Sequence, residues 1–125
     1  MVENDISRQI IGAAIEVHKY LGPGLLESAY SSCLARELTI QGINYTCETP
    51  LDIIYKGEKI DVGYRLDFCV ENRVIIELKS IEKLLPIHDA QLLSYLRLSN
   101  IKLGLLISFN TTLLTKGIKR MVNNL

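Results

Sequence analysis

The chain has 125 residues, which is enough for one domain with a buried core and too few for two independently folded units. We therefore expect a single domain over residues 1–125. Hydrophobic residues make up 48% of the chain and charged residues 22%, a balance that argues against disorder and against a coiled coil. Fourteen basic and fourteen acidic side chains cancel, which excludes the global positive charge that nucleic-acid binders usually carry.

The chain shows neither a membrane segment nor a disulfide framework. No apolar run approaches the roughly 20 residues that span a bilayer, and the first residues lack the basic-then-apolar layout of a signal peptide. We therefore expect a cytoplasmic protein with no membrane partner. Cys33, Cys47 and Cys69 lie far apart without CxxC spacing, so we expect them to be reduced core residues.

The first predicted element is a helix. Apolar residues recur at helical spacing over residues 6–21, after a candidate N-cap at Asn4 or Asp5. The Gly-Pro-Gly run at residues 22–24 ends this helix because glycine and proline both interrupt helical backbone.

A second helix is predicted over residues 25–41, with Gly42 as its C-cap. Glu27 falls on the apolar stripe of this helix, three positions before Tyr30 and seven before Leu34. We therefore expect its carboxylate to face the interior or a cleft, whereas Tyr30 is expected to serve packing.

Residues 44–80 show a period of two, which is typical of strands. Lys56 and Gly57 fit a turn between strand-like segments, and Gly63 marks a bend or bulge. The pattern predicts an antiparallel meander.

The last third of the chain predicts a helix, a strand and another helix. Pro86 suits the first turn of a helix that runs to about residue 99, and residues 103–109 form a continuous apolar strand. A final helix is expected over residues 113–122. The predicted fold is α/β with the order ααβββαβα, a mixed sheet of an antiparallel meander plus a crossover strand, flanked by helices.

The pairing register of the strands at 65–70 and 74–79 determines which of their side chains lie opposite each other. Alternation directs six apolar side chains of these strands toward the core: Leu66, Phe68, Val70, Val74, Ile76 and Leu78. A three-residue loop pairs Val70 with Val74 and keeps these residues on one face, which places Asp67 opposite Glu77. A two-residue loop would pair Asp67 with Ile76 and mix the faces.

Two opposed carboxylates require a positive charge between them. Opposite side chains have Cβ atoms about 4.5–5.5 Å apart, where like charges destabilise a sheet. A divalent cation such as Mg²⁺ or Mn²⁺ would resolve the repulsion between Asp67 and Glu77. Lys79 projects from the same face as Glu77, where its ammonium could orient water or stabilise charge on a phosphate. Gln91 and Tyr95 share a helix face that could close the site.

Each of these residues also has a simpler interpretation. Glu27 alone fits a helix-start acid favoured by the helix dipole. The two strand carboxylates could pair with Arg65 and Lys79 as a surface charge ladder. Gln91 and Tyr95 could be ordinary half-buried helix residues with satisfied hydrogen bonds.

The order of these candidate residues along the chain resembles that of the PD-(D/E)xK nuclease superfamily, particularly its recombination-exonuclease branch. The matching residues are Asp67, then Glu-Leu-Lys at 77–79, then a QxxxY element at 91–95. Leu66 stands where the superfamily name has a proline before the aspartate. Residues 24–30 resemble the GxxExxY motif that names a family of small proteins assigned to this superfamily.

The resemblance implies a restriction-endonuclease-like core and a set of residue roles. Carried over by position, these are Glu27 as a helix acid near the metal, Asp67 and Glu77 as direct ligands, Lys79 as the catalytic lysine, and Gln91 and Tyr95 as accessory residues. The implied activity is metal-dependent hydrolysis of phosphodiester bonds in DNA or RNA, with Mg²⁺ or Mn²⁺ as the cofactor.

A second functional class fits the neutral charge and small size. The fold could serve as a catalytically weak or inactive module that binds nucleic acid or a protein partner. We also expect a homodimer, because so small a nuclease covers little duplex alone and the hydrophobic fraction is high.

Overall fold

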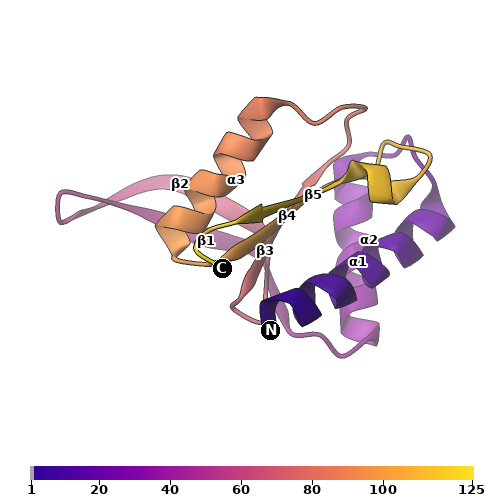
Figure 1. Cartoon of the computed structure of the whole chain (residues 1–125), viewed down its shortest axis with the longest axis horizontal. Helices are drawn as coiled ribbons and strands as arrows, with labels where there is room; N and C mark the ends of the chain where they lie inside the picture. The colour runs from indigo at the N-terminus through magenta and orange to yellow at the C-terminus, as the bar shows by residue number, and fades with distance from the viewer. Residues whose placement is uncertain (1) are drawn as a thin grey trace.

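A five-stranded mixed sheet forms the centre of the molecule, with helices on both of its faces (Figure 1). The structure is a computed structural model that describes residues 2–125. In chain order its elements are α1 (Val2–Leu21), α2 (Glu27–Ile40), β1 (Tyr45–Tyr55), β2 (Glu58–Val70), β3 (Val74–Lys79), α3 (Pro86–Ser99), β4 (Leu103–Ser108), the 3-10 helix η1 (Leu114–Gly117) and β5 (Ile118–Val122).

The sheet has the order β1-β2-β3-β4-β5. The first three strands form an antiparallel meander, and α3 then carries the chain across to β4, which lies parallel to β3. The pairing of Val70 with Val74 confirms the register predicted from a three-residue loop. The predicted α/β architecture, with its meander and crossover strand, is therefore confirmed.

Two cores lie on opposite faces of the sheet. The first packs α1 and α2 against the sheet and includes Ile10, Tyr30, Leu34, Phe68, Ile76 and Phe109. The second packs α3 against the other face and includes Leu66, Cys69, Ile75, Leu92, Tyr95 and Leu106. All six predicted core residues of β2 and β3 are buried, but Leu66 packs with α3 instead of sharing the face of Phe68.

The helix predicted over residues 113–122 is wrong. This segment forms η1 and then β5, which pairs with β4 in antiparallel orientation. Gly117 explains the difference, because a Cβ at this position would lie 2.2 Å from the carbonyl oxygen of Ser108. The chain therefore passes directly against the end of β4 and continues along its free edge, where the strand supplies hydrogen-bonding partners.

The N-cap predicted at Asn4 or Asp5 is also wrong, because α1 begins at Val2 and both residues lie inside its first turn. The Asp5 carboxylate instead accepts a hydrogen bond from Arg8 at 3.1 Å. Between residues 2 and 125, no helix combines the length and apolar character that crossing a bilayer requires.

The three cysteines are free, but they differ in burial. Cys69 is buried and Cys33 is half-buried, whereas Cys47 is exposed on β1. The expectation of core residues is therefore wrong for Cys47.

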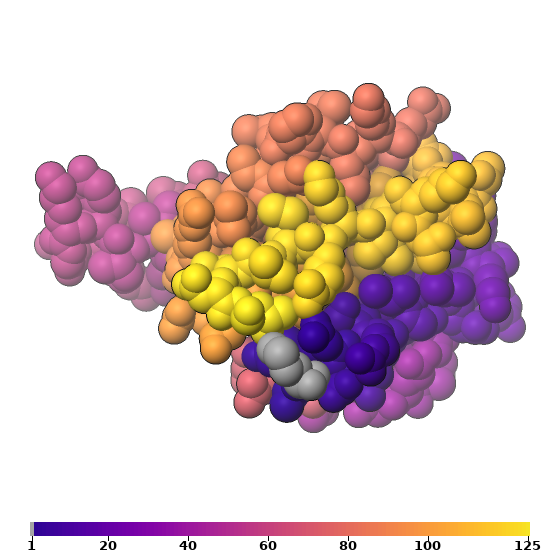
Figure 2. Space-filling view, viewed as in Figure 1, coloured from indigo at the N-terminus to yellow at the C-terminus, as the bar shows by residue number. Residues whose placement is uncertain are grey.

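The β1–β2 hairpin projects from the body of the molecule (Figure 2). Its turn lies at Lys56 and Gly57, whose φ angles of 50° and 83° are both positive, as tight hairpin turns require. The pairing register shifts between Leu51 and Ile53, and Gly63, with a φ of 72°, lies on the opposite strand at this shift. The predicted turn and the predicted bulge are both confirmed.

Candidate functional site

The backbone pairing of β2 with β3 ends where the candidate carboxylates begin. Phe68 and Ile76 form the ladder pair next to the site, and one step further Asp67 faces Glu77. There the N–H of Asp67 donates to Oε2 of Glu77 at 2.8 Å, and the N–H of Leu78 donates to Oδ2 of Asp67 at 2.8 Å. Each carboxylate thus replaces a backbone acceptor of the ladder, and this reciprocal pair of bonds holds both side chains at the end of the paired region.

Pairing is also interrupted on the other side of Asp67. The β1–β2 ladder pairs the residues that flank Glu48 with those that flank Asp67, but it skips these two. Glu48 has a φ of 49°, a left-handed conformation that non-glycine residues rarely adopt. Asp67 therefore lies at an irregularity shared by three strands, and Glu48 is an additional acidic neighbour that the sequence pattern does not predict.

Burial and mutual repulsion shift the titration of both strand carboxyls. Glu77 is only 5% exposed, and burial, followed by the charge of Asp67, raises its pKa to about 8. Burial likewise raises the pKa of Asp67, although the Leu78 N–H and the Lys79 charge oppose that shift. Two ionised carboxylates are unfavourable here without a cation, which is the electrostatic conflict predicted from register.

Lys79 lies near the carboxylates without contacting one as an ion pair. Its charge opposes the rise in the pKa values of Asp67, Glu77 and Glu27, yet no ion pair of Lys79 forms among residues 2–125. The guanidinium of Arg65 points to the carbonyl oxygen of Glu48 at 3.5 Å and pairs with neither strand carboxylate. The surface charge ladder considered above is therefore absent from this part of the chain.

Glu27 is the first residue of α2 and lines a cavity of about 260 Å³ together with Glu48 and Asp67. We call this the acidic cavity. The Glu27 side chain is exposed. Of the two expected positions, the interior or a cleft, the structure therefore shows the cleft. Partial burial, followed by the charge of Asp67, raises the pKa of Glu27, which shows that the helix acid and the strand acid share one electrostatic environment.

The loop before Glu27 is held by hydrogen bonds from two directions. The Tyr30 hydroxyl donates to the carbonyl oxygen of Gly22 at 2.6 Å and accepts the N–H of Leu25 at 3.1 Å. The hydroxyl of Ser80, the residue after β3, donates to the carbonyl oxygen of Leu25 at 2.6 Å. The Tyr30 ring itself stacks on Phe109 at 4.4 Å, in line with its predicted packing role. We call the hydrogen bonds of Tyr30 and Ser80 to this loop the loop clamp; they fix the start of α2 relative to the end of β3.

The helix α3 brings Gln91 and Tyr95 toward Glu77 from the second face of the sheet. The Gln91 amide donates to the Tyr95 hydroxyl at 3.1 Å, which confirms that the two side chains share a helix face. Tyr95 is buried, and burial, followed by the charge of Glu77, raises its pKa. The exposed ring of Tyr64 lies 5.9 Å from that of Tyr95.

The donor set suits a hard divalent cation. Among residues 2–125, no group of three or more His, Cys, Asp or Glu side chains is arranged to hold a metal ion. Asp67 and Glu77 nevertheless supply two carboxylates, and in the described chain only one oxygen of each accepts a hydrogen bond. Mg²⁺ typically takes one or two carboxylates and completes its shell with water and substrate phosphate, so the remaining oxygens fit this class of ion.

The structure thus brings all six predicted site residues to one region of the fold: Asp67, Glu77 and Lys79 from the sheet, Glu27 from α2, and Gln91 and Tyr95 from α3.

A comparison with protein-family models gives a match over most of the chain. A model described as PD-(D/E)XK nuclease superfamily matches residues 4–121, which is nearly the whole chain. Searches of curated proteins and of solved structures gave no significant match. Members of this superfamily generally use divalent metals and act on nucleic acids, and the mixed sheet flanked by helices agrees with a restriction-endonuclease-like fold. The chain therefore belongs to the PD-(D/E)XK nuclease superfamily.

Proposed function

We propose that this protein is a nuclease that hydrolyses phosphodiester bonds in DNA or RNA with the help of Mg²⁺ or Mn²⁺. The observation that carries the proposal is the reciprocal hydrogen bonding of Asp67 and Glu77. It holds two carboxylates together and leaves one oxygen of each without a protein partner in the described chain. Lys79, two residues beyond Glu77 on the same strand, supplies a positive charge beside them.

The roles of the residues follow from their positions. Asp67 and Glu77 would hold the cation, which when bound lowers the pKa of a coordinated water and offsets charge on the phosphate. Lys79 stabilises the negative charge that develops on the phosphate during attack. Glu27 accepts a hydrogen bond from water at the mouth of the acidic cavity and thereby orients it toward the same centre.

Gln91 and Tyr95 have an accessory role in this proposal. Both are neutral hydrogen-bonding groups, so they can contact a nucleic-acid backbone without adding charge to a crowded acidic site. The bond between them restricts their side chains, and the Tyr95 hydroxyl lies within the electrostatic range of Glu77.

The test combines calorimetric Mn²⁺ titration with cleavage of labelled DNA and RNA oligonucleotides. Asp67→Asn and Glu77→Gln are the suitable variants, because each keeps an oxygen that accepts the backbone N–H of the opposing strand. Glu58→Gln, at the exposed tip of the hairpin, is the matched control for loss of one carboxylate. We expect both site variants to lose metal binding and cleavage together, whereas the control keeps both. Absence of wild-type metal binding at millimolar Mn²⁺ would contradict the site.

A second candidate function is a nuclease-fold module that binds nucleic acid or a protein partner without useful cleavage. The specific observation in its favour is that no group of three or more His, Cys, Asp or Glu side chains among residues 2–125 is arranged to hold a metal ion, although Glu27 and Glu48 line the same cavity as Asp67. Lys79→Met separates the two functions: removal of this charge abolishes hydrolysis if the protein is a nuclease, and leaves partner binding largely intact if it is a binding module.

The homodimer expected from chain size and hydrophobic fraction stays a prediction. Sedimentation velocity of the whole chain tests it, and a single monodisperse monomer would contradict it.

A further inference from the structure

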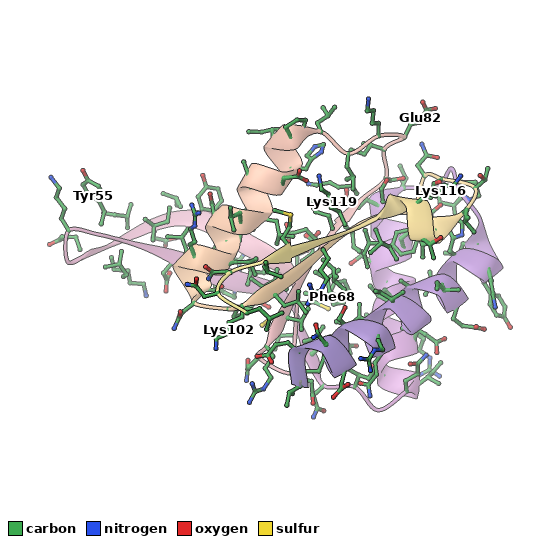
Figure 3. All side chains as sticks on the ribbon, viewed as in Figure 1. Tyr55, Phe68, Glu82, Lys102, Lys116 and Lys119 are labelled. Carbon is green, nitrogen blue, oxygen red and sulfur yellow. The ribbon has the colours of Figure 1, made fainter. Side chains whose placement is uncertain are left out.

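A second cavity, of about 290 Å³, lies at the carboxyl ends of β3 and β4 and is lined mainly by basic and hydroxyl side chains. Its lining includes Lys83 from the loop after β3, Ser108 and Thr111 at and after the end of β4, and Lys116 and Lys119 from η1 and β5. We call this the lysine pocket. Figure 3 shows Glu82 and Lys116 toward one end of the molecule, Lys119 nearer its middle, and Lys102 away from all three.

The lysine pocket borders the candidate nuclease site through the sheet itself. Lys79 and Ser108 are the last pair of the parallel β3–β4 ladder, so the strand that presents Lys79 lies beside the strand that forms one wall of the pocket. The N–H of Phe109 donates to the carbonyl oxygen of Lys79 at 3.1 Å and extends this pairing by one step. In open α/β sheets, ligands bind at the carboxyl ends of the parallel strands, which is where this pocket lies.

The charge of the pocket is positive although the whole chain is neutral. Lys119 is paired with Asp89 of α3, and Glu82 also lines the pocket. Lys83 and Lys116 are exposed and form no ion pair among residues 2–125. Two ammonium groups are therefore available for an anion, in contrast to the acidic cavity, where a phosphate is repelled unless a cation is bound.

The walls of the pocket are fixed by short-range contacts. The buried hydroxyl of Ser108 donates to the carbonyl oxygen of Ile81, which holds the loop carrying Lys83 against β4. The carbonyl oxygen of Thr111 contacts Nε2 of His18 at 2.8 Å, and Gly117 packs directly on Ser108. Because these segments are held in place, little backbone ordering is needed when an anion binds.

From this placement and charge we propose that the lysine pocket binds a backbone phosphate of the same nucleic-acid strand that is cleaved at Asp67 and Glu77. The inference rests on the proposed nuclease function and names a contact that positions its substrate. Lysine ammonium groups bind phosphate as point charges on flexible stems, which suits a backbone contact that is independent of base sequence.

The experiment measures binding without cleavage. Anisotropy of a short fluorescein-labelled DNA or RNA strand is recorded in EDTA over a series of salt concentrations. The test variant is Lys83→Ala/Lys116→Ala, and the matched control is Lys56→Ala/Lys102→Ala, which removes two exposed lysines from the hairpin tip and from the residue before β4. Both variants lose two positive charges, so a difference in affinity between them reflects where the lysines lie and not the total charge.

We expect the test variant to bind about tenfold more weakly than the control. The slope of log K against log salt should be smaller by about 0.7 for each phosphate of a single strand that no longer meets a lysine. Equal affinity and equal slope in the two variants would overturn the proposal. Inorganic phosphate that binds the wild type as tightly as the labelled strand would overturn the assignment to a nucleic-acid backbone.

Cleavage assays in Mn²⁺ distinguish failure of the pocket from failure of the nuclease function. If the wild type binds the strand through Lys83 and Lys116 but cleaves nothing, the proposal for the pocket stands and the proposed nuclease function is contradicted. A wild type that cleaves, with an unchanged KM in the Lys83→Ala/Lys116→Ala variant, keeps the function and removes the pocket.

Discussion

The acidic cavity and the lysine pocket lie on either side of β3, and they differ in sign of charge and in origin. The acidic cavity forms where the β1–β2 and β2–β3 ladders are interrupted at Asp67, so Asp67 and Glu48 come from broken strand pairing, while Glu27 comes from the start of α2. The lysine pocket forms where the parallel β3–β4 pair ends, so Lys83 and Lys116 come from the segments that follow these strands, and Lys119 comes from β5. The total charge of the chain is neutral, but the acidic cavity is locally negative and the lysine pocket is locally positive. Lys79 lies between these two regions.

The largest expected effect is that of Lys79→Met. The substitution removes the ammonium but keeps an unbranched side chain of similar length, so the β3–β4 pairing through this residue is retained. Loss of one group that stabilises the transition state typically costs a factor of about 10² to 10³ in turnover. We expect a loss of this order in kcat while Mn²⁺ affinity is kept. Single-turnover cleavage measures the effect, and a variant with wild-type kcat would show that Lys79 has no part in the chemistry.

The next effect is on stability and concerns Glu77, whose pKa is raised from 4.5 to about 8 in the folded chain. Between these values the folded state binds more protons than the unfolded state, so the free energy of unfolding of the metal-free protein falls as pH rises. Glu77→Gln cannot ionise and keeps an acceptor for the Asp67 N–H. At pH 8 without metal, we expect the variant to be more stable than the wild type by roughly 4 kcal/mol.

Urea unfolding in EDTA at pH 5 and pH 8 measures this difference. At pH 5 the wild-type carboxyl is protonated, so the gap between variant and wild type should nearly close. A gap that is equal at both pH values would contradict the assigned shift. Glu58→Gln, on the exposed hairpin tip, should show no gap at either pH.

The acidic site could be anticipated from sequence because it depends on local rules. The period of two in β2 and β3, together with a three-residue loop, sets the pairing of Val70 with Val74 and hence the approach of Asp67 to Glu77. Pro86 likewise marks the start of α3, because proline is favoured in the first turn of a helix.

The remaining features depend on contacts between distant segments, which periodicity does not report. Glu48 enters the site through a left-handed backbone conformation opposite Asp67, and no residue pattern around it indicates that geometry. The face of Leu66 changes because alternation is broken at the same irregularity. The pattern predicts a helix where β5 lies, because the contact of Gly117 with Ser108 involves segments that meet only in the folded chain.

Gly117→Ala tests that contact, which lies in the wall of the lysine pocket. The added Cβ would meet the Ser108 carbonyl oxygen, which is backbone and cannot rotate away. We expect a loss of stability of about 1–3 kcal/mol, as for other overpacked positions. Gly12→Ala in α1, where a Cβ meets nothing within 4 Å, is the matched control and should not destabilise. Thermal unfolding measures both, and equal melting temperatures in the two variants would contradict the close approach.

The smallest expected effect concerns the loop clamp, the hydrogen bonds that hold the loop before Glu27. Tyr30→Phe keeps the ring that stacks on Phe109 but removes the hydroxyl bonds to Gly22 and Leu25, which hold the loop before Glu27. One such bond contributes about 1 kcal/mol, and a loss of this size in the positioning of Glu27 would lower cleavage by about fivefold.

A double-mutant cycle shows whether the Tyr30 hydroxyl acts through Glu27. If it does, Tyr30→Phe has little further effect on kcat in the Glu27→Gln background, because the group that it positions has already been removed. The same fold decrease in both backgrounds would contradict this and indicate a general loss of structure. Tyr45→Phe, which removes a hydroxyl bond to Thr39 near the other end of α2, is the matched control and should leave kcat unchanged. A positive result makes Tyr30 a positioning residue for Glu27.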